Sequence, residues 1–142
     1  MRITRPAATT LFILLFVGSS AAVAHHGTAQ IYDSQSIMTI KGTVSEVFWG
    51  NPHAYIKVAV KNGSKADEWV AELGSTFNLE RMGWARDRAK VGEPITLTGW
   101  RGKPAKNPYL GATVDSASGL PRLLRLQEAD FANGSQFKIN AQ

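Results

Sequence analysis

The sequence predicts a small all-β domain with one short helix, arranged as an OB-fold-like five-stranded barrel. Five segments alternate apolar and polar residues with the period of a strand, and one short helix signal stands between the third and the fourth. The first segment also changes phase in its middle, as expected for a bent strand that serves two sheets. This order of elements is typical of an OB fold. A small antiparallel β-sandwich built from the same strands is the alternative.

The first predicted strand covers residues 37–49. Its apolar face begins with Met38, Ile40, Gly42 and Val44. The alternation then shifts by one residue, so that Val47 and Trp49 take over the buried side. A phase shift beside a glycine within a strand indicates a bulge or a sharp bend.

The second and third strands form a predicted hairpin. Asn51-Pro52 interrupts the first strand, and the second then places Ala54, Ile56, Val58 and Val60 on one side and Tyr55, Lys57 and Lys61 on the other. Asn62-Gly63 is a strong hairpin signal. The third strand, near residues 68–73, is expected to turn Trp69, Ala71 and Leu73 inward.

The predicted helix starts after Gly74, with Ser75 as its N-cap, and ends at Met82, with Gly83 as the C′ residue. Leu79 and Met82 are expected to face the core.

A fourth strand covers residues 95–100, and Leu110, Ala112 and Val114 mark a fifth. A last apolar piece covers residues 123–126. The residues expected to be almost fully buried are Val44, Ile56, Val58, Leu97 and Val114.

The first 24 residues have the pattern of a cleaved export signal. Arg2 and Arg5 precede an apolar run at 11–17, and Ala22 and Ala24 stand at the small-residue positions before a cut. A membrane anchor is the alternative, but seven strongly apolar residues fall short of the roughly 20 that a spanning helix needs.

The export signal implies a periplasmic protein whose mature chain starts at His25. The expected organisation is a signal peptide at 1–24, an N-terminal arm at 25–36, the barrel at 37–127 and a loose C-terminal tail at 128–142. No membrane span is expected after cleavage.

Charge and cysteine content narrow the range of functions. Loss of Arg2 and Arg5 lowers the formal net charge from +5 to +3, which is below the concentrated positive charge of a dedicated nucleic-acid binder. The chain has no cysteine, which excludes thiol catalysis, iron-sulfur clusters and cysteine-ligated zinc. No hydrolase elbow, zinc-protease helix motif, P-loop or dinucleotide fingerprint is present, so the sequence predicts a non-enzymatic protein.

Several short motifs spread over the mature chain resemble a family of short exported bacterial proteins of unknown function. They are Ala24-His25-His26, Gly42-Thr43-Val44, Trp49-Gly50-Asn51-Pro52-His53-Ala54, Gly74-Ser75, Arg81-Met82-Gly83-Trp84 and Gly99. The Trp-x-Asn-Pro-His-Ala segment is the most distinctive of them. The resemblance implies an OB-like barrel in the periplasm and implies no activity.

The chain has three histidines, His25, His26 and His53, and these are the candidate metal ligands. A mature terminus at His25 would offer an amine and an imidazole from one residue, with His26 or His53 as a third nitrogen donor, a set that suits Cu(II). Cleavage after Ala22 would instead give Val23-Ala24-His25, which also suits copper. The alternative interpretation is a polar terminus without a metal, with His53 as an ordinary turn residue.

Aromatic and basic side chains form a second candidate site. The candidate ligand-binding residues are Trp49, Asn51, Tyr55, Lys57, Trp100 and Arg101. OB folds bind oligonucleotides or oligosaccharides, and the periplasm makes a small molecule, a glycan or a protein the expected partner, not a nucleic acid. Trp69 and Trp84 are expected in the core. The core is also the favoured position for Trp49, with a place on this face as the alternative.

Residues 81–90 carry Arg81, Arg86, Arg88 and Lys90 against the single acid Asp87. This segment is either an anion-binding patch or a solvated charged face.

Overall fold

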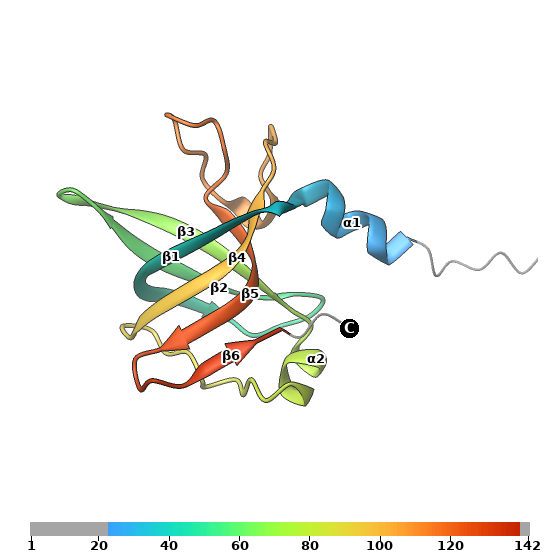
Figure 1. Ribbon diagram of the computed structural model, residues 1–142, viewed down its shortest axis with the longest axis vertical. Helices are drawn as coiled ribbons and strands as arrows, with labels where there is room; N and C mark the ends of the chain where they lie inside the picture. The colour runs from blue at the N-terminus through green and yellow to red at the C-terminus, as the bar shows by residue number, and fades with distance from the viewer. Residues whose placement is uncertain (1–22, 140–142) are drawn as a thin grey trace, which may run out of the picture.

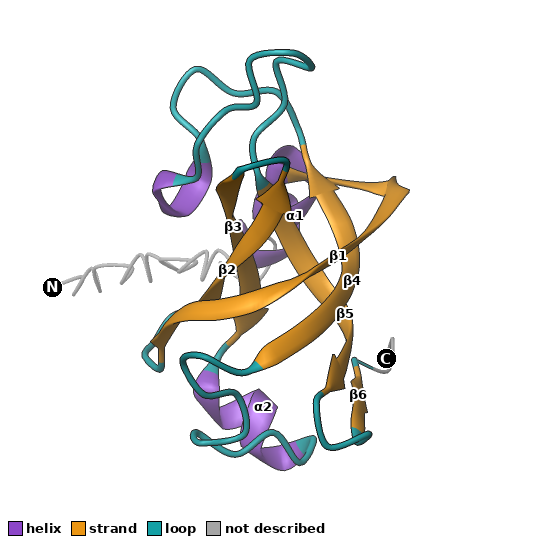
Figure 2. Cartoon of the chain, turned by 90° about the vertical axis from the view of Figure 1, so that its left-hand side faces the viewer, coloured by secondary structure: helices purple, strands orange, loops and turns teal. Residues whose placement is uncertain are grey.

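The computed structural model describes the backbone of residues 23–139 and the side chains of residues 27–139. Its elements are α1 (Val23–Ile31), β1 (Tyr32–Phe48), β2 (Ala54–Asn62), β3 (Lys65–Gly74), α2 (Thr76–Arg81), β4 (Pro94–Gly102), the 3-10 turn η2 (Tyr109–Gly111), β5 (Leu123–Phe131) and β6 (Gln136–Lys138). Helix α1 leads away from the barrel, and α2 lies across its lower end (Figure 1, Figure 2). No helix within residues 23–139 is long and apolar enough to cross a membrane.

The strands close into a barrel with OB-fold topology. The order of the sheet is β3-β2-β1-β4-β5-β6, and an additional parallel pairing of β3 with β5 closes a ring of five strands. Strand β6 extends this ring at β5. The predicted fold class is therefore confirmed, and the ring closure argues against the sandwich alternative, whose two sheets would stay separate.

Strand β1 is the bent strand that serves both sides of the barrel. It pairs with β4 through Ile40 and Leu97 and with β2 through Val44 and Val58. The register with β2 shifts between Val44 and Glu46, which confirms the predicted change of phase. A Cβ atom at Gly42 would lie 2.3 Å from the Ala59 carbonyl oxygen, so only glycine allows the strands to approach this closely.

The alternation of apolar residues predicts the core well where strands form. Val44, Ile56, Val58 and Leu97 are all buried, with at most 1% exposure, and Trp69 and Trp84 lie in the same core. The expectation for Val114 is wrong, because its side chain is 42% exposed. Residues 110–114 hold the end of η2 and one isolated bridge from Val114 to Pro121 instead of a strand, and the fifth strand is β5.

The ends of the barrel are longer than the sequence predicts. Strand β1 begins at Tyr32, inside the segment expected to be an arm. At the other end, β5 runs to Phe131 and β6 follows, where a loose tail was expected. Phe137 of β6 packs edge-on against Trp84 with 4.9 Å between the ring centroids. This packing explains why so short and polar a segment is ordered.

Helix α2 follows its predicted boundaries. The Ser75 side chain accepts a hydrogen bond from the Asn78 amide, Met82 is the C-cap and Gly83 has a positive φ of 88°. Leu79 is buried as expected. Met82 is 39% exposed, contrary to expectation, since it stands just beyond the helical turn that faces the core.

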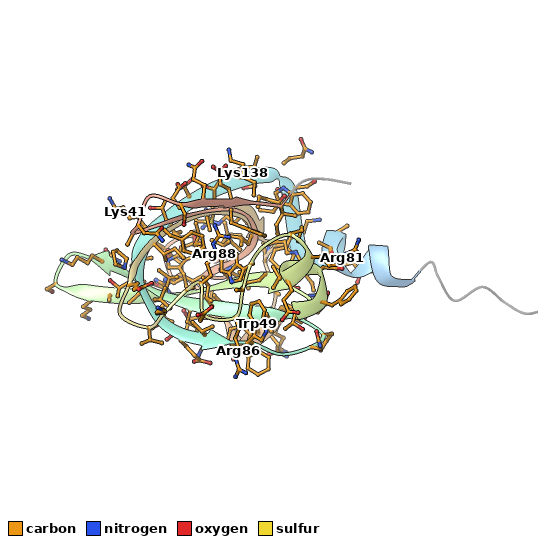
Figure 3. The ribbon with its side chains drawn as sticks, turned by 90° about the horizontal axis from the view of Figure 1, so that it is seen from below. Lys41, Trp49, Arg81, Arg86, Arg88 and Lys138 are labelled. Atoms are coloured by element: carbon orange, nitrogen blue, oxygen red, sulfur yellow. The ribbon has the colours of Figure 1, made fainter. Side chains whose placement is uncertain are left out.

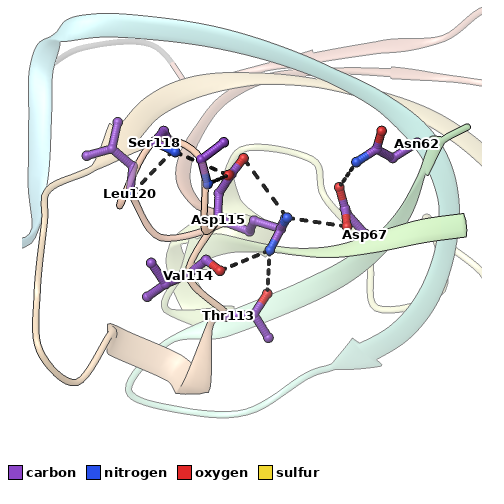
Figure 4. A network of polar contacts seen from close by, with 9 residues as sticks. Asn62, Asp67, Thr113, Val114, Asp115, Ser118 and Leu120 are labelled. Atoms are coloured by element: carbon purple, nitrogen blue, oxygen red, sulfur yellow. Dashed lines mark hydrogen bonds and ion pairs between the residues drawn. The ribbon is translucent and has the colours of Figure 1, made fainter.

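Residues 103–122 leave the barrel between β4 and β5 and fold back over its outer face. Arg122 anchors this excursion through ion pairs to Asp67 and Asp115 and through hydrogen bonds donated to Thr113 and to the Val114 carbonyl (Figure 4). A second apolar cluster forms under the excursion. It contains Tyr32, Val70, Ala112 and Leu123, with Tyr55, Trp100, Tyr109 and Leu110 packed against it.

Candidate functional site

A buried carboxylate lies on the outer face of β3, beside the parallel seam with β5. Among residues 27–139, Glu72 is the one charged residue that is buried, with 3% exposure. Its neighbours Ala71 and Leu73 point into the barrel core, so alternation places Glu72 on the outside. The Tyr32 and Arg125 side chains reach it there. A charge in such a position must be paired.

Every contact of Glu72 satisfies its negative charge. The Tyr32 hydroxyl donates a hydrogen bond to Oε2. Arg125 donates from Nη1 to Oε1 at 2.6 Å, and His53 contacts the same oxygen through Nδ1. We call these four residues, Tyr32, His53, Glu72 and Arg125, the Glu72 cluster.

The tyrosines around this carboxylate stay protonated. Burial, followed by the negative charge of Glu72, raises the pKa of Tyr32 far above its usual value. The same two causes raise the pKa of Tyr109. Tyr32 is therefore a neutral hydrogen-bond donor at all ordinary pH values.

His53 is held at the edge of the cluster by the loop that precedes it. The Asn51 Oδ1 atom accepts hydrogen bonds from the amide and the hydroxyl of Thr76, both at 3.2 Å, which ties the loop to α2. Because the Nδ1 contact with Glu72 is shorter than the 3.4 Å separation from Arg125 Nη1, we assign the Nδ1 proton to the bond with Glu72. In the neutral form of this half-buried imidazole, the assignment leaves Nε2 as the nitrogen with a lone pair.

A pocket of about 310 Å³ adjoins the Glu72 cluster at Arg125. It lies between the end of β3, α2 and the end of the described chain. Its lining consists of Leu73, Gly74, Ser75, Asn78, Leu79, Arg81, Met82, Arg125 and Ile139. We call this the α2 pocket. Two guanidinium groups and an apolar wall make it suited to a small ligand with an anionic group and an apolar body.

Two of the predicted ligand-binding residues are occupied by contacts within the chain. Tyr55 stacks on Phe48 with 4.9 Å between ring centroids and donates a hydrogen bond to Glu46. Lys57 forms ion pairs with Glu46 at 2.9 Å and with Glu68 at 3.4 Å.

The other predicted residues do not form one face. Trp100 packs with Tyr55 against the apolar cluster under the excursion of residues 103–122, and Arg101 pairs in register with Leu124 of β5. Asn51 fixes a loop, as described above. Trp49 is half-buried against the core and lines a separate hollow near Arg86 (Figure 3). The outer face of the barrel is thus partly covered by the chain's own excursion.

The predicted metal ligands are described only in part. The side chains of His25 and His26 lie outside the described residues, and α1 places their backbone on a helix that leads away from the barrel (Figure 1). Within the described part of the chain, no three His, Cys, Asp or Glu side chains are grouped as metal ligands. Among these four residue types in the described part of the chain, the side chain that His53 contacts is that of Glu72.

The sequence gives no signal for three members of the Glu72 cluster. Glu72 and Arg125 stand at outward positions of strands, where charged residues are normally solvated, and Tyr32 precedes the first clear alternation. Tyr32 and Arg125 lie 40 and 53 residues from Glu72 along the chain. Only the closure of the barrel brings them together.

Comparison with known proteins identifies the family and no activity. The mitochondrial single-stranded DNA-binding protein Rim1 of S. cerevisiae is a solved structure with 12% sequence identity, covering 75% of this chain and 98% of that one. Its TM-score of 0.46 is too low to support a conclusion about this chain. No curated protein matches the sequence. Residues 13–110 match a family of unknown function (DUF6152), and the chain therefore belongs to that family.

Proposed function

We propose that this protein is an exported, non-enzymatic binding module that holds a small organic acid in the α2 pocket. The observation that carries the proposal is the position of Arg125. Its guanidinium is fixed by Glu72 at 2.6 Å and also lines the pocket, so a cation is presented to the ligand in a predetermined orientation.

The charge and polarity of the lining favour an acid with an apolar body. Arg81 lines the same pocket as Arg125. Its guanidinium lies 5.6 Å from the centre of the Phe77 ring and forms no ion pair with an acidic side chain of the described residues. Arginine binds carboxylates through paired hydrogen bonds. The side chains of Leu73, Met82 and Ile139 supply apolar surface for the remainder of the ligand.

The location of the protein is part of the proposal. The export pattern of residues 1–24, with Ala22 and Ala24 before the cut, supports secretion to the periplasm. Mass spectrometry of the protein purified from a periplasmic extract tests this step, with a mature start at His25 as the expected result. Full-length protein retained in the membrane would support the anchor instead.

Binding of hexanoate, with hexanamide as the uncharged counterpart, tests the ligand class. Ligand-observed NMR should show hexanoate binding at least about 10-fold more tightly than hexanamide, because a charged hydrogen bond is worth about 1.5–3 kcal/mol. Arg81→Ala should weaken hexanoate binding by about 10-fold, and Arg86→Ala, which removes a neighbouring cation outside the pocket, should not. Equal binding of acid and amide would contradict the proposal.

A copper-binding function is the second candidate, and the orientation of His53 favours it. Metal-ligating histidines almost always donate their other ring N–H to a carboxylate, a backbone carbonyl or water, and His53 contacts the Glu72 carboxylate through Nδ1. His53 would then offer Nε2 to a Cu(II) ion, and His25 and His26 are the proposed remaining donors, which requires α1 to fold back from the position it has in Figure 1.

Copper titration of untagged mature protein tests this candidate. Binding should be tighter at pH 7.5 than at pH 5, because imidazole and amine groups must lose protons before they bind a metal. His53→Ala should weaken Cu(II) binding, and one extra residue before His25 should weaken it further by displacing the amine. Unchanged affinity in both variants would exclude this site.

A further inference from the structure

An open hollow of about 560 Å³ shares no lining residue with the α2 pocket. One wall consists of Val47 and Trp49 at the end of β1. The other wall is formed by the segment between α2 and β4, through Arg86, Asp87, Ala89, Lys90 and Val91. We call this the Trp49 hollow. Seen from below, Trp49 and Arg86 lie together at one edge of the barrel, and Arg81 lies apart from them (Figure 3).

The segment that carries the charges is held rigidly. Ala89 is inserted into the barrel core with 5% exposure. Arg88 donates hydrogen bonds to the carbonyls of Gly83 at 2.7 Å and Gln136 at 2.8 Å. The two pinned residues, Arg88 and Ala89, thus stand between the exposed pairs 86–87 and 90–91, which line the hollow. Such a fixed backbone prepares side chains for binding at little entropic cost.

The segment is also fastened to β1 at the level of the hollow. The Val44 amide donates to the Glu93 carbonyl, and the Gly92 amide donates to the Val44 carbonyl, both at 2.9 Å. Trp49 follows directly after the end of β1. The two walls of the hollow therefore form one rigid unit.

The tryptophan is positioned by its neighbours in the loop after β1. Val47 and Trp49 both pack against the barrel core, which leaves the indole half-buried. The next residue is Gly50, where a Cβ atom would lie 2.6 Å from the Phe48 ring. A side chain at position 50 would therefore have to displace the end of the Phe48 ring, which is 43% exposed.

The chemistry of the hollow combines an aromatic ring, one carboxylate and two cations. None of Arg86, Asp87 and Lys90 forms an ion pair with another described side chain. An aromatic ring packs against the C–H face of a sugar, a carboxylate accepts hydrogen bonds from hydroxyl groups, and arginine and lysine bind an anionic group. From this combination we propose that the Trp49 hollow binds an acidic saccharide. Its ring would lie on Trp49, its carboxylate between Arg86 and Lys90, and its hydroxyls on Asp87.

The charge balance distinguishes this ligand from a more highly charged one. Arg86, Asp87 and Lys90 together carry one net positive charge, which matches one carboxylate per sugar ring. A polyphosphate or an anionic membrane would place several negative charges against Asp87. This site goes beyond the α2 pocket and does not depend on the proposed function of that pocket.

Titration with trigalacturonic acid, followed through the indole N–H signals in NMR spectra, tests the proposal. The Trp49 signal, assigned with Trp49→Phe, should shift and saturate, whereas the buried Trp69 and Trp84 should not respond. Maltotriose, as a neutral trisaccharide, should bind at least about 10-fold more weakly. Arg86→Ala and Lys90→Ala should each reduce the affinity by about 5–10-fold, and Arg81→Ala should leave it unchanged.

Several results would overturn the assignment. Equal affinity for maltotriose and trigalacturonic acid would show that Arg86 and Lys90 do not bind the carboxylate of the ligand. Tighter binding of ADP than of the saccharide would identify a nucleotide site. Shifts of the Trp49 signal with anionic lipid vesicles and not with the saccharide would identify a membrane surface. Thermal melting of each variant must match that of the natural chain, which separates loss of binding from loss of folding.

Discussion

The Glu72 cluster and the Trp49 hollow place similar charged residues in opposite physical situations. In the cluster, the carboxylate is 3% exposed and its partners are all within the chain. In the hollow, Arg86, Asp87 and Lys90 are exposed and the backbone beneath them is fixed by other residues. The buried Glu72 charge therefore stabilises the barrel seam, and of its partners Arg125 also reaches the α2 pocket, whereas all three charges at the hollow are exposed to a ligand. Mutations should therefore affect stability strongly at the first region and weakly at the second.

The largest expected effect is that of Arg125→Met. The substitution leaves the Glu72 carboxylate buried without its main counterion, and breaking a buried ion pair from one side costs about 3–5 kcal/mol of the free energy of unfolding. Because Arg125 is 20% exposed and Tyr32 and His53 remain, we expect a value near the lower limit, about 3 kcal/mol. Urea denaturation measures it. The double variant Arg125→Met, Glu72→Gln should recover part of the loss, and a single-variant loss below about 1 kcal/mol would mean that Glu72 is not paired as described.

Tyr32→Phe should have the next largest effect. It removes a hydrogen bond to a buried carboxylate, which contributes about 1.5–3 kcal/mol. Burial raises the pKa of Tyr32 above the unfolded value of 10.0, so the neutral hydroxyl stabilises the fold fully below pH 10, and this contribution decreases as the pH rises above 10. Unfolding curves between pH 8 and pH 11 should show a steeper loss of stability for the natural chain than for Tyr32→Phe. Parallel curves would contradict the role of this hydroxyl.

Arg88→Ala removes support from the segment that lines the hollow and should have an intermediate effect. The arginine lies beneath the hollow without lining it, donates two hydrogen bonds to carbonyls and stacks 4.8 Å above the Phe131 ring. Because the side chain is half-buried, we expect a loss of about 1–2 kcal/mol in thermal or urea unfolding. Hydrogen exchange should also become faster in residues 85–93, while the Glu72 cluster keeps its protection. No change in exchange would mean that Ala89 alone holds the segment.

The sequence predicts the barrel because its information there is local. Alternation every second residue identifies the inward positions of β2 and β4, and the Ser75 cap with Gly83 defines α2. The same reasoning fails at Val114, where the apolar spacing of residues 110–114 comes from packing of the excursion onto the outer cluster and not from a strand. An apolar residue at every second position shows that one side of a segment is apolar. It does not tell a strand of the barrel from a loop that packs on the barrel's outer face.

The candidate sites depend on contacts that are distant in sequence. Trp49 and the basic segment each stand out in the sequence, but only the hydrogen bonds of Val44 to Gly92 and Glu93 show that they form one hollow. His53 is visible as a histidine in a distinctive motif, whereas its partner Glu72 looks like an ordinary solvated residue of a strand. Pairings of this kind follow from the closure of the barrel and not from local pattern.

The smallest expected effect on stability is that of Arg86→Ala, and it is the strictest test of the comparison. Arg86 is exposed, so its removal should change the free energy of unfolding by less than about 0.5 kcal/mol, the range of ordinary surface substitutions. Asp87→Asn should be equally mild and should weaken saccharide binding, because an amide oxygen accepts hydroxyl hydrogen bonds less strongly than a carboxylate. Urea unfolding and the trigalacturonic acid titration on the same samples measure both quantities. A loss of stability above about 1 kcal/mol at Arg86 would show that this side chain supports the fold, and the distinction between the two regions would then fail.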